Sequence, residues 1–255
     1  SRAASRGEEV TELYTWGLSK NYQLGFGAHG DQQPLPRLVG LPGKVQVRSL
    51  SCGHFHTVAI TACGSLFTWG FGGPTSRLGV EPPAKSSALP SCIVQPTRLP
   101  EFGPGRFIAV KAGAGLNHTL ALTSEGRILA WGSNAHGQLG LQGVPSGEDA
   151  TARRPQVLRG LLKGEAVRDI AAGGSHSLCI AASGGVFVWG SNLCGELGLG
   201  APPSGPVEAT SPQQLPHLKG AYAVAASASV RVSVVIAAHG DAVIFGGAPL
   251  PPSAG

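Results

Sequence analysis

Short runs of β-branched and aromatic residues recur in pairs along the chain, and a glycine divides each pair. The run over 56–61 is followed by Ala62-Cys63-Gly64 and then by a second run that ends at Trp69. Two such runs around a glycine-containing turn are typical of a β-hairpin. The same pattern predicts hairpins over 118–131, 176–189 and 232–245, and a further strand before each hairpin over 45–51, 107–112, 166–172 and 221–226.

The hairpins belong to an internal repeat whose landmarks keep fixed distances. Trp-Gly dipeptides begin at Trp16, Trp69, Trp131 and Trp189, and Phe245-Gly246 ends a matching segment. Thirteen residues before the aromatic residue stand His56, His118, His176 and Val232, and five residues before it stand Gly64, Gly126, Gly184 and Gly240. Units of this length that each supply three or four strands are the blades of a β-propeller.

Composition agrees with short strands and many turns. The chain has 39 glycines and 20 prolines in 255 residues, which excludes long helices, and 42% hydrophobic residues, which argues against disorder. Most prolines fall between the end of one unit and the next predicted strand, which predicts loops between blades: Pro34, Pro36, Pro82, Pro83, Pro155, Pro202 and Pro203. A net charge of +5 without a clustered basic excess predicts no nucleic-acid partner, and no apolar stretch is long enough for a membrane span.

Two motifs carry a family resemblance. The run Trp131-Gly-Ser-Asn-x-x-Gly-Gln-Leu-Gly140, together with Ala172-Gly-Gly-Ser-His-Ser177, resembles the regulator-of-chromosome-condensation (RCC1-type) repeat family. The resemblance implies an all-β propeller, usually of seven blades. At about 57 residues per unit, this chain holds four to five, so we expect an arc of a larger propeller. Its expected bounds are residues 10–247, between a flexible segment 1–9 and a proline-rich tail 248–255, and we expect the remaining blades or flanking domains outside this chain, which contains no methionine.

The repeated residues are expected to be structural. The tryptophans are predicted to fill blade cores, the repeated glycines to permit tight turns, and the repeated histidines to pack or to hydrogen-bond turns. His54 and His56 share one face of a strand, but no third ligand is evident, so no metal site is predicted. No catalytic or phosphate-binding motif is present, which predicts a protein without enzymatic activity and without a cofactor.

Candidate partner-binding residues are basic and are expected in loops. One stretch contains Arg153, Arg154, Arg159, Lys163 and Arg168. It is typical of a solvated loop, or of a contact for an acidic protein surface. The longest connection, between Gly79 and Pro104, contains Lys85 and is predicted to be a partner-binding insertion.

These features favour a non-catalytic interaction scaffold. The run Leu13–Gly25, with Phe55-His-Thr57, is similar to the propeller of inhibitor-of-Bruton-tyrosine-kinase proteins, which implies a substrate adaptor of cullin-type ubiquitin ligases. The alternative is a guanine-nucleotide exchange factor for a Ran-like small GTPase, the founding activity of the family. Five scattered cysteines without a disulfide framework favour an intracellular protein, cytoplasmic or nuclear.

Overall fold

The computed structural model describes residues 11–27, 30, 32–43, 45–80, 92–160, 164–200, 207–218 and 221–247. These residues form 17 strands and one short 3-10 helix, η1 (Pro216–Leu218), and the protein is therefore all-β. The predicted segments 1–9 and 248–255, as well as Lys85 and Lys163, lie outside the described residues.

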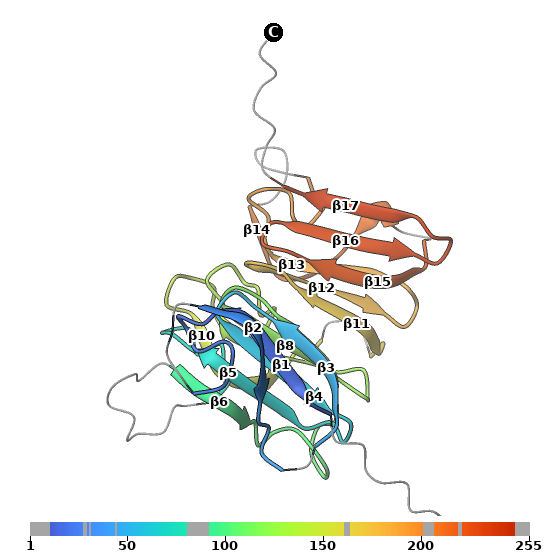
Figure 1. Ribbon diagram of the computed structural model, residues 1–255. Coiled ribbons are helices and arrows are strands. Elements are labelled where there is room, and N and C mark those ends of the chain that lie inside the picture. The colour runs from blue at the N-terminus through green and yellow to red at the C-terminus, as the bar shows by residue number, and fades with distance from the viewer. Residues whose placement is uncertain are drawn as a thin grey trace, which may run out of the picture.

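Three sheets are complete four-stranded antiparallel blades, and Figure 1 shows them in chain order. Blade 2 contains β3 (Val47–Cys52), β4 (His56–Thr61), β5 (Leu66–Phe71) and β6 (Cys92–Arg98). Blade 3 contains β7 (Ala109–Ala114), β8 (His118–Thr123), β9 (Ile128–Ser133) and β10 (Thr151–Val157). Blade 4 contains β11 (Val167–Ala172), β12 (His176–Ala181), β13 (Val186–Ser191) and β14 (Glu208–Gln214).

The sheets at the two ends of the arc are incomplete among the described residues. Half-blade 1 consists of β1 (Leu13–Leu18) and β2 (Gln32–Val39), and blade 5 of β15 (Ala223–Ala228), β16 (Val232–Ala237) and β17 (Ala242–Gly246). Nine of the twelve exposed large hydrophobic residues of the described chain belong to these end sheets and their connections, whereas Leu50, Leu193 and Val207 belong to blades 2 and 4. The nine are Tyr14, Trp16, Leu18, Leu35, Leu38, Tyr222, Val230, Ile236 and Ile244. Together with the open sheets, this distribution identifies the fold as part of a larger propeller.

The repeated tryptophans do not share one environment, contrary to the prediction that all four are core residues. Trp69, Trp131 and Trp189 are fully buried, whereas Trp16 is 60% exposed. Trp16 lies on β1, and the described residues provide no preceding strands and no preceding blade against which it can pack. The repeat therefore needs a neighbouring blade to bury its aromatic residue.

The prediction that prolines mark loops is wrong for the outermost strand of each blade. Pro34 and Pro36 lie in β2 and Pro155 in β10, and the predicted long connection from Gly79 to Pro104 contains β6. A proline occupies the equivalent position in all four outer strands: Pro36 in β2, Pro96 in β6, Pro155 in β10 and Pro212 in β14. Each lies where the pairing with the preceding strand is interrupted. Proline lacks an N–H and is tolerated on edge strands and at bulges, so it also protects these edges from further pairing.

The hydrophobic core is divided among the interfaces between blades. Neighbouring blades contact through their first strands, β3, β7, β11 and β15. Trp131 belongs to one buried cluster with β4 residues Val58 and Ile60 of the preceding blade, and Trp189 belongs to another with β8 residues Leu120 and Leu122. Each blade thus buries apolar side chains of the next blade. The loops that carry the candidate sites lie at these interfaces.

Candidate partner-binding surfaces

The repeated histidines join each blade to the next. Nε2 of His56, His118 and His176 lies 2.8–2.9 Å from the hydroxyl oxygen of Thr119, Ser177 and Ser233, respectively. Each of these hydroxyl groups donates in turn to a loop carbonyl of the preceding blade, at 2.8 Å in all three cases. These hydrogen bonds connect neighbouring blades rather than turns of their own blade.

This arrangement determines the protonation of the rings. Because each hydroxyl hydrogen is used toward a carbonyl oxygen, the hydroxyl oxygen must accept from Nε2–H, which assigns the Nε2–H tautomer. The Nδ1 atoms of all three rings are buried and have no partner among the described residues. Burial lowers the pKa of His56 and His118 to about 3 and that of His176 to about 4, with the nearby Glu196 carboxylate opposing the shift at His176.

The buried tryptophans bind the same loop carbonyls. Nε1 of Trp69, Trp131 and Trp189 donates to the carbonyl oxygens of Gln23, Arg77 and Gln138, at 2.8–2.9 Å. In each blade this carbonyl belongs to the residue before the Leu-Gly pair. One loop oxygen therefore accepts from both an indole and a hydroxyl group of the next blade, which holds the loops on this face in place.

On the opposite face, the repeated glycines connect the blades through their backbone. The carbonyls of Gly64, Gly126 and Gly184 accept from the N–H of Ala109, Val167 and Ala223 of the following blade, at 2.9–3.1 Å. Their φ angles lie between 74° and 85°, in the left-handed region that favours glycine. Gly240 also has a positive φ, but a Cβ atom there would meet nothing within 4 Å among the described residues.

The basic stretch is distributed over two blades instead of lying in one loop, which corrects the prediction. Arg153 and Arg154 lie in β10, and Arg168 lies in β11; all three are exposed, as is Arg159. Arg168 donates from Nη1 to the hydroxyl oxygen of Tyr222 at 3.0 Å and lies over its ring, so it joins blades 4 and 5.

Arg153 and Arg154 occupy the interrupted part of β10, between the paired residues Ala152 and Gln156. At the same step, the other outer strands carry uncharged residues: Pro34-Leu35 in β2, Val94-Gln95 in β6 and Thr210-Ser211 in β14. Neither arginine has an acidic residue within 4 Å among the described residues. A bulge turns side chains away from the ladder, so both charges are presented on the outer edge of blade 3.

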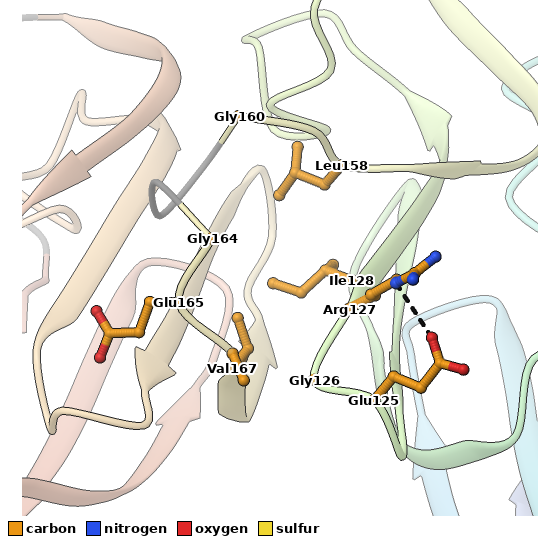
Figure 2. A pocket seen from close by; sticks show the side chains of 10 residues that line it. Glu125, Gly126, Arg127, Ile128, Leu158, Gly160, Gly164, Glu165 and Val167 are labelled. Atoms are coloured by element: carbon orange, nitrogen blue, oxygen red, sulfur yellow. Dashed lines mark ion pairs between the residues drawn. The ribbon is translucent and has the colours of Figure 1, made fainter.

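A cavity of 260 Å³ lies between blades 3 and 4, and its lining includes Leu158 and Gly160, the chain neighbours of Arg159. Figure 2 shows Glu125 and Arg127 joined by an ion pair on one side of this cavity, and Glu165 on the other. The ion pair is exposed, and the Glu165 carboxylate accepts from the backbone N–H of Ser183 at 2.6 Å. The charged groups around this cavity already have partners.

A larger cavity of 380 Å³ lies on the face of the histidine and tryptophan network, between blades 4 and 5. Its lining includes Ser191, Leu193, Glu196, Val230 and Arg231, and Glu196 is buried, with 4% of its surface exposed. Glu196 is not among the candidate residues predicted from the sequence. The sequence did contain a signal for this residue. Glu196 precedes a Leu-Gly pair, and the residues at the same position of the other units are the neutral Gln23 and Gln138 and the basic Arg77.

No group of three or more His, Cys, Asp or Glu side chains is placed to hold a metal ion in the described part of the chain. The same part has no helix long and apolar enough to cross a membrane.

The blades and the network between them define a propeller built from one repeated unit. Residues 5–248 match the RCC1-like domain, and the chain belongs to this family. It is 31% identical over 222 residues to the human probable E3 ubiquitin-protein ligase HERC6, covering 87% of this chain and 20% of that protein. It is 30% identical over 192 residues to the Ultraviolet-B receptor UVR8 of Arabidopsis thaliana, covering 75% of this chain and 40% of the receptor.

Solved structures agree on the fold. Human WBSCR16 superimposes with a TM-score of 0.78 at 26% identity, covering 95% of this chain and 58% of that one. Yeast RCC1 (Prp20), bound to Kap60, gives a TM-score of 0.74 at 24% identity, covering 92% of this chain and 52% of that one. This chain therefore spans little more than half of these propellers and a minor part of the curated relatives.

Proposed function

We propose that this chain is a non-catalytic scaffold that binds the acidic surface of a protein partner along the outer edge of blade 3. The observation that carries the proposal is the arginine pair Arg153–Arg154, which the bulge of β10 presents to solvent without an acidic partner among the described residues. Exposed like charges on a rigid support steer an oppositely charged surface and determine its register.

The network between the blades supports a scaffold. It uses the buried histidines, hydroxyl groups and indoles to hold the loops, so the most strongly shifted histidines are committed to structure. Relatives of the chain include the human probable E3 ubiquitin-protein ligase HERC6. By extension, we propose that this propeller binds the substrates or components of a larger regulatory or ubiquitin-ligase assembly within the cell.

The proposal is tested by charge reversal. Arg153→Glu with Arg154→Glu should reduce recovery of the bound partner in an affinity pulldown at least tenfold, because two attractive contacts become repulsive. The matched control is Arg48→Glu, an exposed arginine on β3 that should leave recovery unchanged. Equal recovery with the double variant and the unaltered chain would rule out the outer edge of blade 3 as the binding surface.

The second candidate, nucleotide exchange on a Ran-like GTPase, has a fold likeness to yeast RCC1 as its support, and at 24% identity that likeness concerns the fold alone. We expect micromolar chain to leave the release of fluorescent GDP from Ran at its uncatalysed rate. Release accelerated tenfold or more would favour the exchange factor over the scaffold.

A further inference from the structure

The cavity between blades 4 and 5 is lined by residues whose counterparts in blade 2 are larger or carry the opposite charge. In blade 2, the residue before the histidine is Phe55, the second residue after the tryptophan is Phe71, and the residue before Leu-Gly is Arg77. The Arg77 guanidinium lies 4.8 Å and 5.4 Å from the centroids of these two rings and donates to the carbonyl of Leu116 in the next blade at 3.0 Å. Two rings and a buried guanidinium thus occupy this part of the blade 2 interface.

In blade 4 the same three positions carry small or acidic side chains. They are Ser175, Ser191 and Glu196, and all three line the 380 Å³ cavity. Two serines replace two phenylalanines, and a carboxylate replaces the guanidinium. The repeat therefore opens a space at this interface and reverses the charge that lies beside it.

The fold does not need this negative charge. Glu196 accepts through Oε1 from the Ser191 hydroxyl at 2.9 Å and through Oε2 from the N–H of Cys194 at 2.6 Å. At the place of the second bond, Gln23 and Gln138 accept through Oε1 from the N–H of Asn21 and His136. The neutral amides of half-blade 1 and blade 3 thus make the same structural bond. A buried carboxylate costs desolvation free energy unless a cation accompanies it, and no cationic side chain lies within 4 Å of Glu196 among the described residues.

The lining suits a long cationic side chain. Leu193 and Val230 are 58% and 55% exposed and offer apolar surface for methylene groups, while the Glu196 carboxylate, oriented by the hydroxyl that Ser191 donates to it, provides the acceptor. The volume lies at the lower end of the range for ligand pockets, which is the scale of one side chain rather than a large ligand. Two basic side chains also line the cavity: His136, which lies 3.7 Å from the carboxylate of Glu208, and the exposed Arg231. An acidic residue beside the inserted cation would complement Arg231.

We propose that this cavity receives an arginine side chain of a partner protein, with its guanidinium on the Glu196 carboxylate and its methylene groups against Leu193 and Val230. A planar guanidinium can donate to both carboxylate oxygens and remains charged when it is desolvated. This extends the proposed scaffold function to a second surface, formed by residues other than Arg153 and Arg154.

The test uses the full 255-residue chain, labelled with ¹⁵N, and N-acetyl-arginine-N-methylamide as the probe. The probe should shift the backbone amide resonance of Cys194 with a saturable, millimolar dissociation constant. Its citrulline analogue, which has the same shape without the charge, should bind at least tenfold more weakly. Equal shifts with both probes, or saturable shifts only at amides outside the cavity, would overturn the proposal.

Glu196→Gln restores the residue found in half-blade 1 and blade 3, so the fold and the hydrogen bond from Cys194 should persist while the charge is lost. Arginine affinity should fall at least tenfold. The matched control Glu125→Gln removes an exposed carboxylate that does not line this cavity and should leave affinity unchanged. Unchanged affinity in Glu196→Gln would contradict the proposal; because the probe does not involve β10, failure of the Arg153–Arg154 test would leave this result intact.

Discussion

Acidification below pH 6.5 should destabilise this protein steeply, because three histidines are buried in the neutral form. Burial holds the pKa of His56 and His118 at about 3 and that of His176 at about 4, whereas an unfolded histidine titrates near 6.5. The unfolded state therefore binds more protons as the pH falls, and stability that is fully present above pH 6.5 is lost toward the folded pKa values. Each histidine contributes about 1.4 kcal/mol per pH unit, so the three together contribute about 4 kcal/mol per pH unit in this window.

The measurement is urea unfolding, followed by circular dichroism, at intervals between pH 7.5 and 5. This range lies above the usual pKa of carboxyl groups, which limits their contribution to the slope. His118→Gln removes one titrating ring and should reduce the slope by about one third, whatever it does to stability at pH 7.5. A variant slope equal to that of the unaltered chain would show that His118 does not enter the folded state as a neutral ring.

The sequence predicted the inner three strands of each blade well because their landmarks lie close together. His118 and Trp131 are 13 residues apart on adjacent strands, β8 and β9, and Gly126 is at the turn that joins them. Hairpins are local structures, so period and turn chemistry suffice to identify them. The predicted hairpins and the strand before each agree with the structure to within two or three residues at their ends.

The outer strands were missed because proline was read as a loop residue. Pro96 and Pro155 do lie in strands, but each lies on an edge where no further strand needs its missing N–H. A signal was present: a proline stands three residues before Val39, Leu99, Leu158 and Leu215, which are all buried. The number of residues between the tryptophan and this proline differs from blade to blade, because the loop between them varies in length. The proline therefore does not recur at a fixed distance from the tryptophan.

The candidate surfaces were less predictable because they depend on residues far apart in the chain. Nothing local to His118 indicates that its partner is Ser177 of the next blade. Similarly, Arg168 belongs to the same basic stretch as Arg153, but the fold places it on β11 against Tyr222. Once the repeat is aligned blade by blade, the departures from it, such as Glu196 and the Arg153–Arg154 pair, become visible in the sequence itself.

The second large effect concerns the glycine of the Trp-Gly pair, for which the chain supplies its own control. Gly132 and Gly17 have nearly the same backbone, with φ of 103° and 110°. A Cβ atom at Gly132 would lie 2.5 Å from the carbonyl oxygen of Asn117 and 2.7 Å from Cα of His118, whereas at Gly17 it would meet nothing within 4 Å among the described residues. Both alanine variants carry the strain of a positive φ, but only one also collides with backbone.

Gly17→Ala should therefore cost about 1–2 kcal/mol of unfolding free energy, which is the cost of an alanine in this backbone region. Gly132→Ala should cost about 3–5 kcal/mol, because the strand that carries His118 must move and the bond to Ser177 is disturbed. Gly190→Ala repeats the collision in blade 4, with Ser175 O and His176 Cα at 2.5 Å and 2.7 Å, and should match Gly132→Ala in urea unfolding at pH 7.5. Equal losses of unfolding free energy in Gly17→Ala and Gly132→Ala would contradict this prediction. They would mean that glycine is required at position 132 for its φ angle alone, and that β8 and β9 can move apart with little loss of stability.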